Sequence, residues 1–196
     1  MSQPLALVPL KGWVEGKQRL AGALPDDLRH RLAVATAGMV VNSFEESGFA
    51  VAVVTSDPAV TAWAEEHRIG TIPDAGHGLD AAATDAVAAA AGRPWCLVHG
   101  DLPLIDVADT DALRAALDAG ETALAPSRDG GTNAIASTGG FRFRFGPGSF
   151  HRHLASAGER VRVLVSVGLA LEVDTPADLA AAASLPRGRW LRGFVA

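Results

Sequence analysis

The stretch FAVAVVTSDPAVTAWAEEHRI, residues 49–69, decides the fold class. Residues 49–56 are almost continuously apolar, which is typical of a strand buried on both faces in a parallel sheet. Ser56, Asp57 and Pro58 follow as a helix-start signature, because a capping side chain precedes a proline near the first helical position. The stretch therefore predicts a strand that leads directly into a helix, the unit of α/β sheets.

The same alternation extends to both sides of this stretch. Residues 5–10 (LALVPL) and 94–100 (PWCLVHG) are apolar runs that we expect to be buried strands. Helical spacing or alanine-rich composition predicts helices over residues 27–46, 79–91 and 109–118. Alternating strands and helices predict a three-layer α/β fold with a mostly parallel sheet.

The second half of the chain has a different character. Residues 121–127 (ETALAPS), 133–137 (NAIAS) and 168–173 (GLALEV) are short strand candidates, and 175–185 (TPADLAAAASL) is expected to be a closing helix. These segments predict extra, partly antiparallel strands, so the sheet as a whole is expected to be mixed. The arginine-containing tail, residues 186–196, is expected to be a strap over the body of the protein.

Composition limits the kinds of protein to consider. The chain has 196 residues, of which 48% are hydrophobic and 20% are charged, enough for one domain spanning residues 1–196. A net charge of −5 argues against a nucleic-acid surface. A single cysteine, Cys96, suits a reducing cytoplasm, and the N-terminal apolar run is too short for a signal peptide or membrane span. We expect a cytoplasmic monomer or homodimer that binds neither nucleic acid nor membrane.

Two charged segments follow predicted strands, where open α/β sheets bind their ligands. Lys11, Lys17 and Arg19 come after the first strand and have the charge to clamp a triphosphate, although a solvated loop explains them too. Asp101 in HGDLPL follows the strand at 94–98. A carboxylate there suits Mg²⁺ above nucleotide phosphates, and the alternative is a cap of the following turn.

A second group of polar residues lies in the C-terminal half. Glu172 and Asp174 are two residues apart on an extended segment, so their side chains point to one face and favour a cation between them. Asp174 also fits a helix cap before Pro176. Gly146 and Ser149, in FGPGSFHRHL, lead into a helix whose amide end would favour a phosphate or carboxylate.

The segment DGGTNAIAS, residues 129–137, places two glycines, Thr132 and Asn133 before a strand candidate. Glycine and aspartate dominate turns for conformational reasons, so a hairpin turn explains the segment. Glycines also let a backbone approach a ligand, and a threonine hydroxyl can donate to an oxyanion. The residues alone leave both explanations open.

In this order, the motifs VPLK, GKQRL, GLDAA, GDLPL, GGTNAI, FGPGSFHRH and EVDTPADL resemble the CofC/FbiD family of guanylyltransferases. The resemblance extends from residue 4 to residue 182. It implies the nucleotide-diphospho-sugar transferase fold, which is glycosyltransferase-A-like and is shared by many nucleotidyltransferases.

The resemblance also implies an activity. Such enzymes join GMP from GTP to a three-carbon phosphorylated acid, phosphoenolpyruvate or 2-phospho-L-lactate, with Mg²⁺ and release of pyrophosphate, in coenzyme F-420 biosynthesis. The implied catalytic residues are Lys11, Lys17, Arg19 and Asp101; the metal ligands are Asp101, Glu172 and Asp174; the acid-binding residues are Thr132, Asn133, Gly146 and Ser149; the nucleotide-binding residues are Gly78, Leu79 and Asp80.

The chain departs from the family pattern at Gln18, Asp80, His99 and Glu172. Two alternatives therefore stay open at this point. One is another nucleotidyltransferase of the superfamily, of molybdopterin or sugar-phosphate type, although the GGxGxRxG loop usual in those enzymes is missing after the first strand. The other is a homologue that binds nucleotide without turnover. The sequence does not choose between the two acids.

Overall fold

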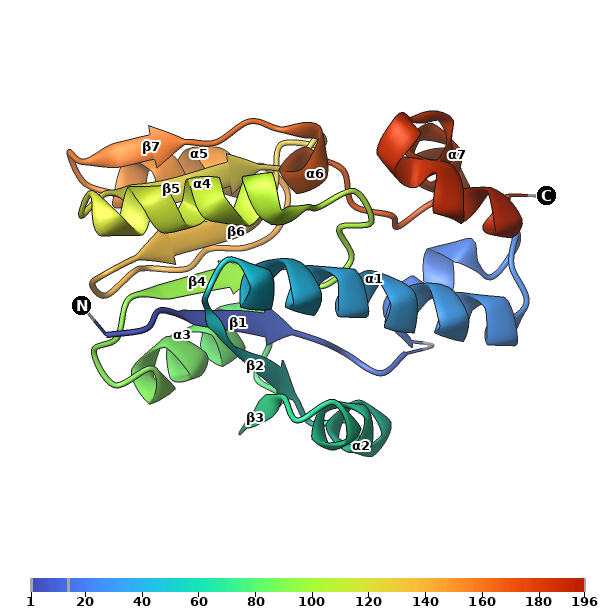
Figure 1. Ribbon diagram of the computed structural model, residues 1–196, viewed down its shortest axis with the longest axis horizontal. Coiled ribbons are helices and arrows are strands. Elements are labelled where there is room, and N and C mark those ends of the chain that lie inside the picture. Colours follow the sequence, from blue (N-terminus) through green and yellow to red (C-terminus); the bar gives the residue numbers. More distant parts are fainter. Residues whose placement is uncertain (1, 14, 196) are drawn as a thin grey trace.

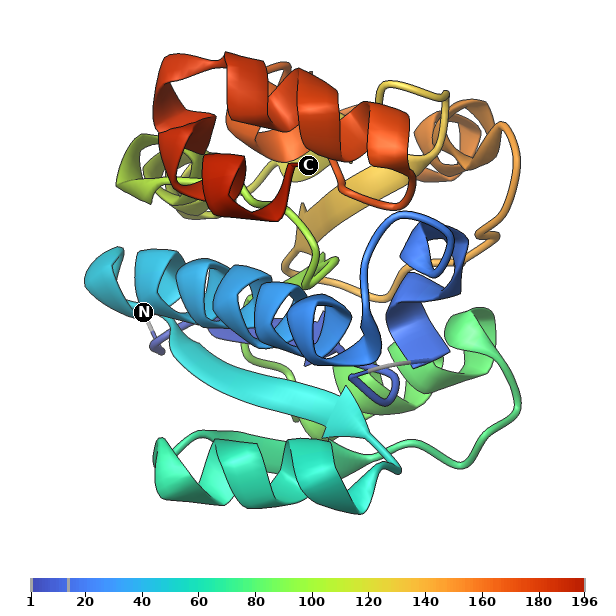
Figure 2. The ribbon, with the colours of Figure 1, turned by 90° about the vertical axis from the view of Figure 1, so that its right-hand side faces the viewer.

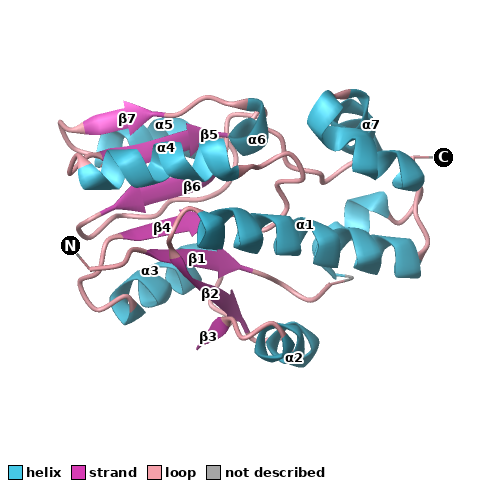
Figure 3. Ribbon diagram, in the orientation of Figure 1, coloured by secondary structure: helices cyan, strands magenta, loops and turns pink. Residues whose placement is uncertain are grey.

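The computed structural model describes residues 2–13 and 15–195, and their strands form one seven-stranded sheet (Figures 1 and 3). The strands are β1 Leu5–Pro9, β2 Ala50–Thr55, β3 Gly70–Pro73, β4 Trp95–Val98, β5 Thr122–Pro126, β6 Thr132–Ser137 and β7 Val161–Val163. Their order is β3-β2-β1-β4-β6-β5-β7, and β6 runs antiparallel to both of its neighbours while the other pairs are parallel. The mostly parallel, mixed sheet is confirmed.

Helices cover both faces of this sheet, which gives the predicted three layers (Figure 1). They are α1 Asp26–Glu46, α2 Pro58–Glu66, α3 Leu79–Ala89, α4 Val107–Asp118, α5 Ser149–Ser156, α6 Val167–Ala170 and α7 Pro176–Ser184, with 3-10 helices η1 Glu15–Leu20 and η2 Pro186–Phe194. One hydrophobic core lies between the sheet and α1, α2 and α4, and a second lies under α3 and α5. Among the described residues, no helix combines the length and the apolar character that crossing a membrane requires.

The strand-to-helix stretch that opened the sequence analysis folds as predicted. The strand β2 is buried from Val51 to Thr55. Asp57 caps α2 by accepting hydrogen bonds from the N–H groups of Ala59 at 2.8 Å and Val60 at 3.0 Å, and Pro58 occupies the first turn. The cap satisfies amides that the helix itself leaves without partners, and this fixes where α2 begins.

One strand prediction was wrong, and two strands were missed. Residues 168–173 were expected to be a strand, but Val167–Ala170 forms the helical turn α6, whose first turn is capped by the Ser166 side chain. Gly168 lies so close to α4 that a Cβ there would be 1.9 Å from Asp109 Oδ2. This buried close approach requires glycine at this position of the helical turn. The missed strands, β3 and β7, are the short outer strands of the sheet.

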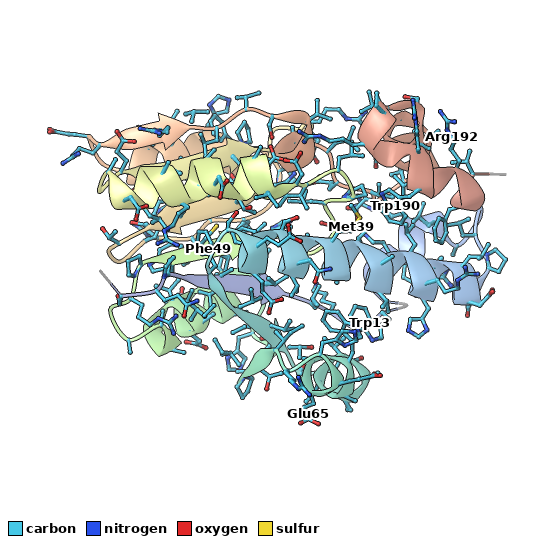
Figure 4. All side chains as sticks on the ribbon, viewed as in Figure 1. Trp13, Met39, Phe49, Glu65, Trp190 and Arg192 are labelled. Carbon is cyan, nitrogen blue, oxygen red and sulfur yellow. The ribbon has the colours of Figure 1, made fainter. Side chains whose placement is uncertain are left out.

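A third core closes the end of the sheet toward which the β1 arrow points in Figure 1. It joins η1, the first part of α1, α7 and η2 through buried leucines, including Leu20, Leu32 and Leu191. Figure 2 shows α7 and η2 together above the start of α1, and Figure 4 places Trp190 at this end. The Trp190 indole N–H donates to the Pro103 carbonyl at 3.2 Å, so the tail is a strap over the body, as predicted.

Candidate active site

A cavity of about 210 Å³ opens where β3, β2, β1 and β4 end side by side. It is lined by the loop after β1, including Lys11 and Lys17, and by His99 and Asp101 after β4. Leu79, at the start of α3, completes one wall. The carboxyl ends of parallel strands meet at one edge, so segments far apart in the sequence share this cavity.

Lys17 is the residue that holds the centre of the site together. Its backbone leaves the helical conformation (φ −123°), which interrupts η1, and its side chain is buried. The Nζ atom donates to Asp101 Oδ2 at 3.0 Å and to the Val173 carbonyl at 2.7 Å, and lies 3.8 Å from Asp174 Oδ1. The structure thus brings together Lys17, Asp101 and Asp174, three residues singled out from separate motifs.

The carboxylates around Lys17 have unequal pKa values. Burial opposes ionisation of Asp101 and is the largest single influence, but the charges of Lys17 and His99 and the hydrogen bonds to the carboxylate together hold the pKa of Asp101 below its usual value. Burial, followed by the charge of Asp101, raises the pKa of Glu172 to about 7 and raises the pKa of Asp174. Repulsion of this kind is typical of carboxylates that share a small space.

The fit of these residues to a divalent cation rests on one unsatisfied atom. Asp101 Oδ1 is buried and makes no hydrogen bond with any described residue. Among the described residues, no group of three or more His, Cys, Asp or Glu side chains is arranged to hold a metal ion. An open carboxylate oxygen near a second carboxylate, Asp174, nevertheless fits Mg²⁺, which prefers one or two carboxylates completed by phosphate oxygens and water.

The other two predicted phosphate ligands line different cavities. Lys11 is exposed and lines the main cavity. Arg19 is also exposed; its Nη1 lies 3.8 Å from Asp174 Oδ2, and it lines a second, polar cavity with Glu172 and Asp174. Asp174 is the residue between the two cavities, since it is in ion-pair distance of both Lys17 and Arg19.

The predicted acid-binding residues Thr132 and Ser149 are in contact and buried. The Arg144 N–H donates to His153 Nε2 at 2.8 Å, so that nitrogen is unprotonated and the neutral ring donates through Nδ1–H to Thr132 Oγ1, 2.9 Å away. Burial lowers the pKa of His153 to about 4, in agreement with a neutral ring. Ser149 Oγ also donates to Thr132 Oγ1, at 3.3 Å, which leaves the Thr132 hydroxyl proton for another acceptor.

The glycine pair before Thr132 is the turn of the β5–β6 hairpin. Asp129 Oδ1 accepts from the Gly131 N–H at 3.0 Å, and Gly130 has φ +87°, a conformation that favours glycine. The β5–β6 register shifts beside Pro126, which ends the strict alternation of faces. Thr132 therefore contacts α5, whereas the next residue, Asn133, donates its amide to the Leu169 carbonyl at 3.0 Å.

The loop that precedes α5 is held in a conformation that depends on glycine. Gly146 has φ +109° and Gly148 has φ +67°, and the Gly146 carbonyl accepts from the Ser149 N–H at 3.0 Å. Arg152, which the sequence analysis did not assign, donates to the carbonyls of Arg144, Gly146 and Pro147 and so clamps the loop. A lone arginine in a helix carries no sequence signal for such a role.

The predicted nucleotide-binding residues lie at the start of α3. Gly78, with φ +93°, is the N-cap residue, and Leu79 lines the main cavity. Asp80 does not cap its helix; its Oδ1 accepts from the Phe145 N–H at 2.7 Å. This bond ties the start of α3 to the residue before Gly146, so the predicted nucleotide-binding and acid-binding segments are neighbours.

Two further residues of the main cavity were not assigned to it from the sequence. His99 was noted only as a departure from the family pattern; its Nε2 is buried and makes no hydrogen bond with the described residues. Asp74 follows β3, and β3 was itself missed. The signal that could have revealed Asp74 is its position, because a carboxylate directly after a parallel strand lies at the ligand-binding edge.

Comparison with known proteins gives consistent matches. The family described as "Guanylyl transferase CofC like" matches residues 5–184. Phosphoenolpyruvate guanylyltransferase of Chloroflexus aggregans is 34% identical over 85% of this chain and 90% of its own length. 2-Phospho-L-lactate guanylyltransferase of Methanopyrus kandleri is 33% identical over 92% of each chain.

Solved structures agree on the fold. A nucleotidyl transferase from Methanothermobacter superposes with a TM-score of 0.64 at 17% identity, covering 98% of this chain and all of its own (100%). The Rv0371c protein of Mycobacterium tuberculosis, solved in complex with manganese, superposes with a TM-score of 0.60 at 19% identity, covering 92% and 97% of the two chains. At these identities the likeness concerns the fold, and it confirms the nucleotidyltransferase fold expected from the sequence.

Proposed function

The chain belongs to the family of CofC-like guanylyl transferases, and on that premise we propose that it joins GMP from GTP to phosphoenolpyruvate or 2-phospho-L-lactate. It is a nucleotidyltransferase, and family membership favours this activity over a molybdopterin or sugar-phosphate enzyme or a binder without turnover. Pyrophosphate is the other product, and coenzyme F-420 biosynthesis is the proposed pathway.

The observation that carries the proposal is the position of Lys17 between Asp101 and Asp174 in the lining of the main cavity. A buried ammonium between two carboxylates is held in one place, whereas a free lysine side chain is mobile. With Lys11 on the same cavity and Arg19 beside Asp174, three cations are available to the triphosphate. Positioning and charge neutralisation are what nucleotidyl transfer requires from a protein.

We propose Mg²⁺ as the metal, with Asp101 and Asp174 as its protein ligands and Glu172 beside them. The open Oδ1 of Asp101 and the crowding that raises the Glu172 pKa to about 7 support this assignment. Rv0371c, a protein with a similar fold, was solved in complex with manganese, so in that protein the fold accommodates a divalent cation. When bound, Mg²⁺ would neutralise phosphate charge and polarise the phosphorus that is attacked.

The acid would bind near Thr132, Ser149 and Gly146. The Thr132 hydroxyl, which accepts from His153 and Ser149, has its own proton to donate to a carboxylate or phosphate oxygen. The attacking group is a phosphate oxygen of the acid, which is ionised at neutral pH, so no side-chain base is needed. This oxygen forms a bond to the α-phosphorus of GTP while the bond to pyrophosphate breaks.

The test is pyrophosphate release by purified protein with Mg²⁺ and GTP, with each acid supplied separately. The next enzyme of the pathway and its deazaflavin acceptor would be added to consume the product. Release that depends on either acid supports the proposal and identifies the acceptor. A folded protein that binds GTP but releases no pyrophosphate with either acid would overturn it.

A variant pair tests the metal assignment. Asp101→Asn keeps the size of the side chain but removes the charge, and we expect turnover to fall by at least about 100-fold, since the metal and Lys17 both lose their partner. Asp118→Asn, at the exposed end of α4, is the control and should keep wild-type turnover. Near-normal activity of the Asp101 variant at low Mg²⁺ would contradict the assignment.

The remaining proposals concern the protein as a whole. One sheet containing all seven described strands supports a single domain over residues 1–196. The only cysteine of the chain, Cys96, is buried and unpaired, which suits a reducing cytoplasm. We propose a monomer or homodimer, and light scattering of the purified protein distinguishes the two.

A further inference from the structure

Asp74 is the second carboxylate of the main cavity among its described lining residues, and no role has been given to it above. It follows β3 directly, and its N–H donates to the Thr55 carbonyl at the end of β2, at 3.1 Å. Its Oδ1 accepts from the Gly76 N–H at 2.9 Å. The backbone around Asp74 is therefore fixed to the edge of the sheet, and the carboxylate is oriented by its own turn.

The carboxylate of Asp74 still has capacity to accept hydrogen bonds. Within the described part of the chain, Asp74 forms no ion pair, and Gly76 engages one of its two oxygens. An ionised carboxylate has about four lone-pair sites. Two parallel hydrogen bonds from a ligand would therefore find acceptors here.

The elements around the cavity contribute different kinds of side chain. Lys11, Lys17 and Asp101 come from the segments after β1 and β4, whereas the lining contributed by β2 and α3 is apolar: Val54, Leu79 and Ala82. Apolar walls with a few placed polar groups are typical of sites that hold a small molecule such as a nucleotide base. The triphosphate would lie against Lys11, Lys17 and Asp101, so the base of the nucleotide would point toward Asp74.

The spacing of the strands supports this orientation. The strands β3, β2, β1 and β4 are consecutive neighbours, so the ends of β3 and β4 are three strand spacings apart, or about 14 Å. A nucleoside phosphate spans this distance, with Asp74 at the base edge and Asp101 at the phosphate through its metal. Both carboxylates line the same cavity, as this arrangement requires.

We propose that Asp74 selects guanine, with its carboxylate accepting hydrogen bonds from the N1–H and the 2-amino group of the base. Guanine presents two adjacent donors on this edge. Adenine presents a ring nitrogen with a lone pair there, which a carboxylate repels. The inference rests on the proposed function for the identity of the nucleotide, and it names the residue that reads the base.

The experiment compares GTP, ITP and XTP in the wild type, in Asp74→Asn and in Asp85→Asn. Inosine lacks the 2-amino group, and xanthine carries a carbonyl in its place. Asp85 is an exposed residue of α3 and is the matched control. Nucleotide affinity is measured by calorimetry with Mg²⁺, and kcat/KM is measured by pyrophosphate release with the acid identified above.

In the wild type we expect ITP to bind about 10-fold more weakly than GTP, because one charge-assisted hydrogen bond is lost. Asp74→Asn should bind GTP about 10- to 100-fold more weakly than the wild type does. It should bind XTP more tightly than the wild type does, because an amide N–H can donate to the xanthine carbonyl. The Asp85 variant should keep the wild-type preference. If Asp74 had only a structural role, Asp74→Asn would instead weaken the binding of all three nucleotides equally.

Equal weakening of GTP, ITP and XTP in Asp74→Asn, or no change in preference, would overturn the inference. The calorimetric arm does not depend on turnover. If the wild type binds GTP in preference to XTP but releases no pyrophosphate, the proposed function fails while the role of Asp74 is still decided by the variant. If turnover is normal and the variant keeps the guanine preference, the proposed function stands and Asp74 is not the residue that reads the base.

Discussion

Protonation of His153 should destabilise the folded protein at mildly acidic pH. The buried ring accepts from the Arg144 N–H through Nε2, and a proton on that nitrogen would remove this bond and leave a charge inside the protein. The nearby charges, Asp80 and Arg152, act on the ring in opposite directions, and burial is the larger cause. The folded state therefore resists a proton that the unfolded chain accepts.

The magnitude follows from the two pKa values. Folding lowers the pKa of His153 from 6.5 to about 4, so the stabilisation is complete above pH 6.5 and is lost as the pH falls toward 4. Each pKa unit corresponds to about 1.4 kcal/mol, so the contribution of His153 to the unfolding free energy should fall by about 2 kcal/mol between about pH 7.5 and about pH 5.

The assay is urea unfolding followed by tryptophan fluorescence at both pH values. His153→Gln keeps a donor and an acceptor but does not titrate, so it should lose about 2 kcal/mol less than the wild type over this range. His151→Gln, an exposed position on the same helix, should behave like the wild type. The reasoning is refuted if the wild type and His153→Gln lose equal stability between the two pH values.

Three further predictions test packing and the site. Gly188→Ala would place a Cβ 1.8 Å from the Ala182 carbonyl oxygen, so it should lower the unfolding free energy by more than about 2 kcal/mol. Gly193→Ala, with no atom within 4 Å of the added Cβ, should change it little, and urea unfolding that finds the two variants alike would contradict the packing argument. Thr132→Ala should raise the KM for the acid about 10-fold and leave the KM for GTP nearly unchanged; equal increases would remove Thr132 from the acid site. Asp174→Asn should raise the Mg²⁺ concentration that gives half-maximal rate by at least about 10-fold, and an unchanged Mg²⁺ dependence would exclude Asp174 as a ligand.

Sequence reasoning was most successful where local signals agreed with one another. The apolar run at Val51–Val54 and the cap Asp57 predicted β2 and α2, because burial and capping act within a few residues. The strand prediction for residues 168–173 was wrong for the opposite reason. Its apolar pattern suits a strand, but the segment forms a helical turn that packs against α4, with Gly168 close to Asp109, a contact between distant parts of the chain.

The candidate site shows the same difference between local signals, which sequence motifs reveal, and contacts between distant segments, which they do not. Motifs pointed to Lys17, Asp101 and Asp174, because each stands at the end of a predicted strand or the start of a helix. No sequence signal showed that Lys17 would be buried between the two aspartates, at 3.0 Å from one and 3.8 Å from the other. Those distances depend on how η1 and the segment before α7 pack over the sheet.

The sequence by itself determined the layered α/β fold, the order of most elements and which charged residues lie at one edge of the sheet. These properties follow from periodicity, capping and turn chemistry, which act over short stretches of chain. Only the tertiary structure decided that His153 is a neutral support for Thr132 and that Asp74 shares a cavity with Asp101. Such relations arise from contacts between segments that are distant in the chain, and a side chain acquires its partners and its pKa only when those segments meet.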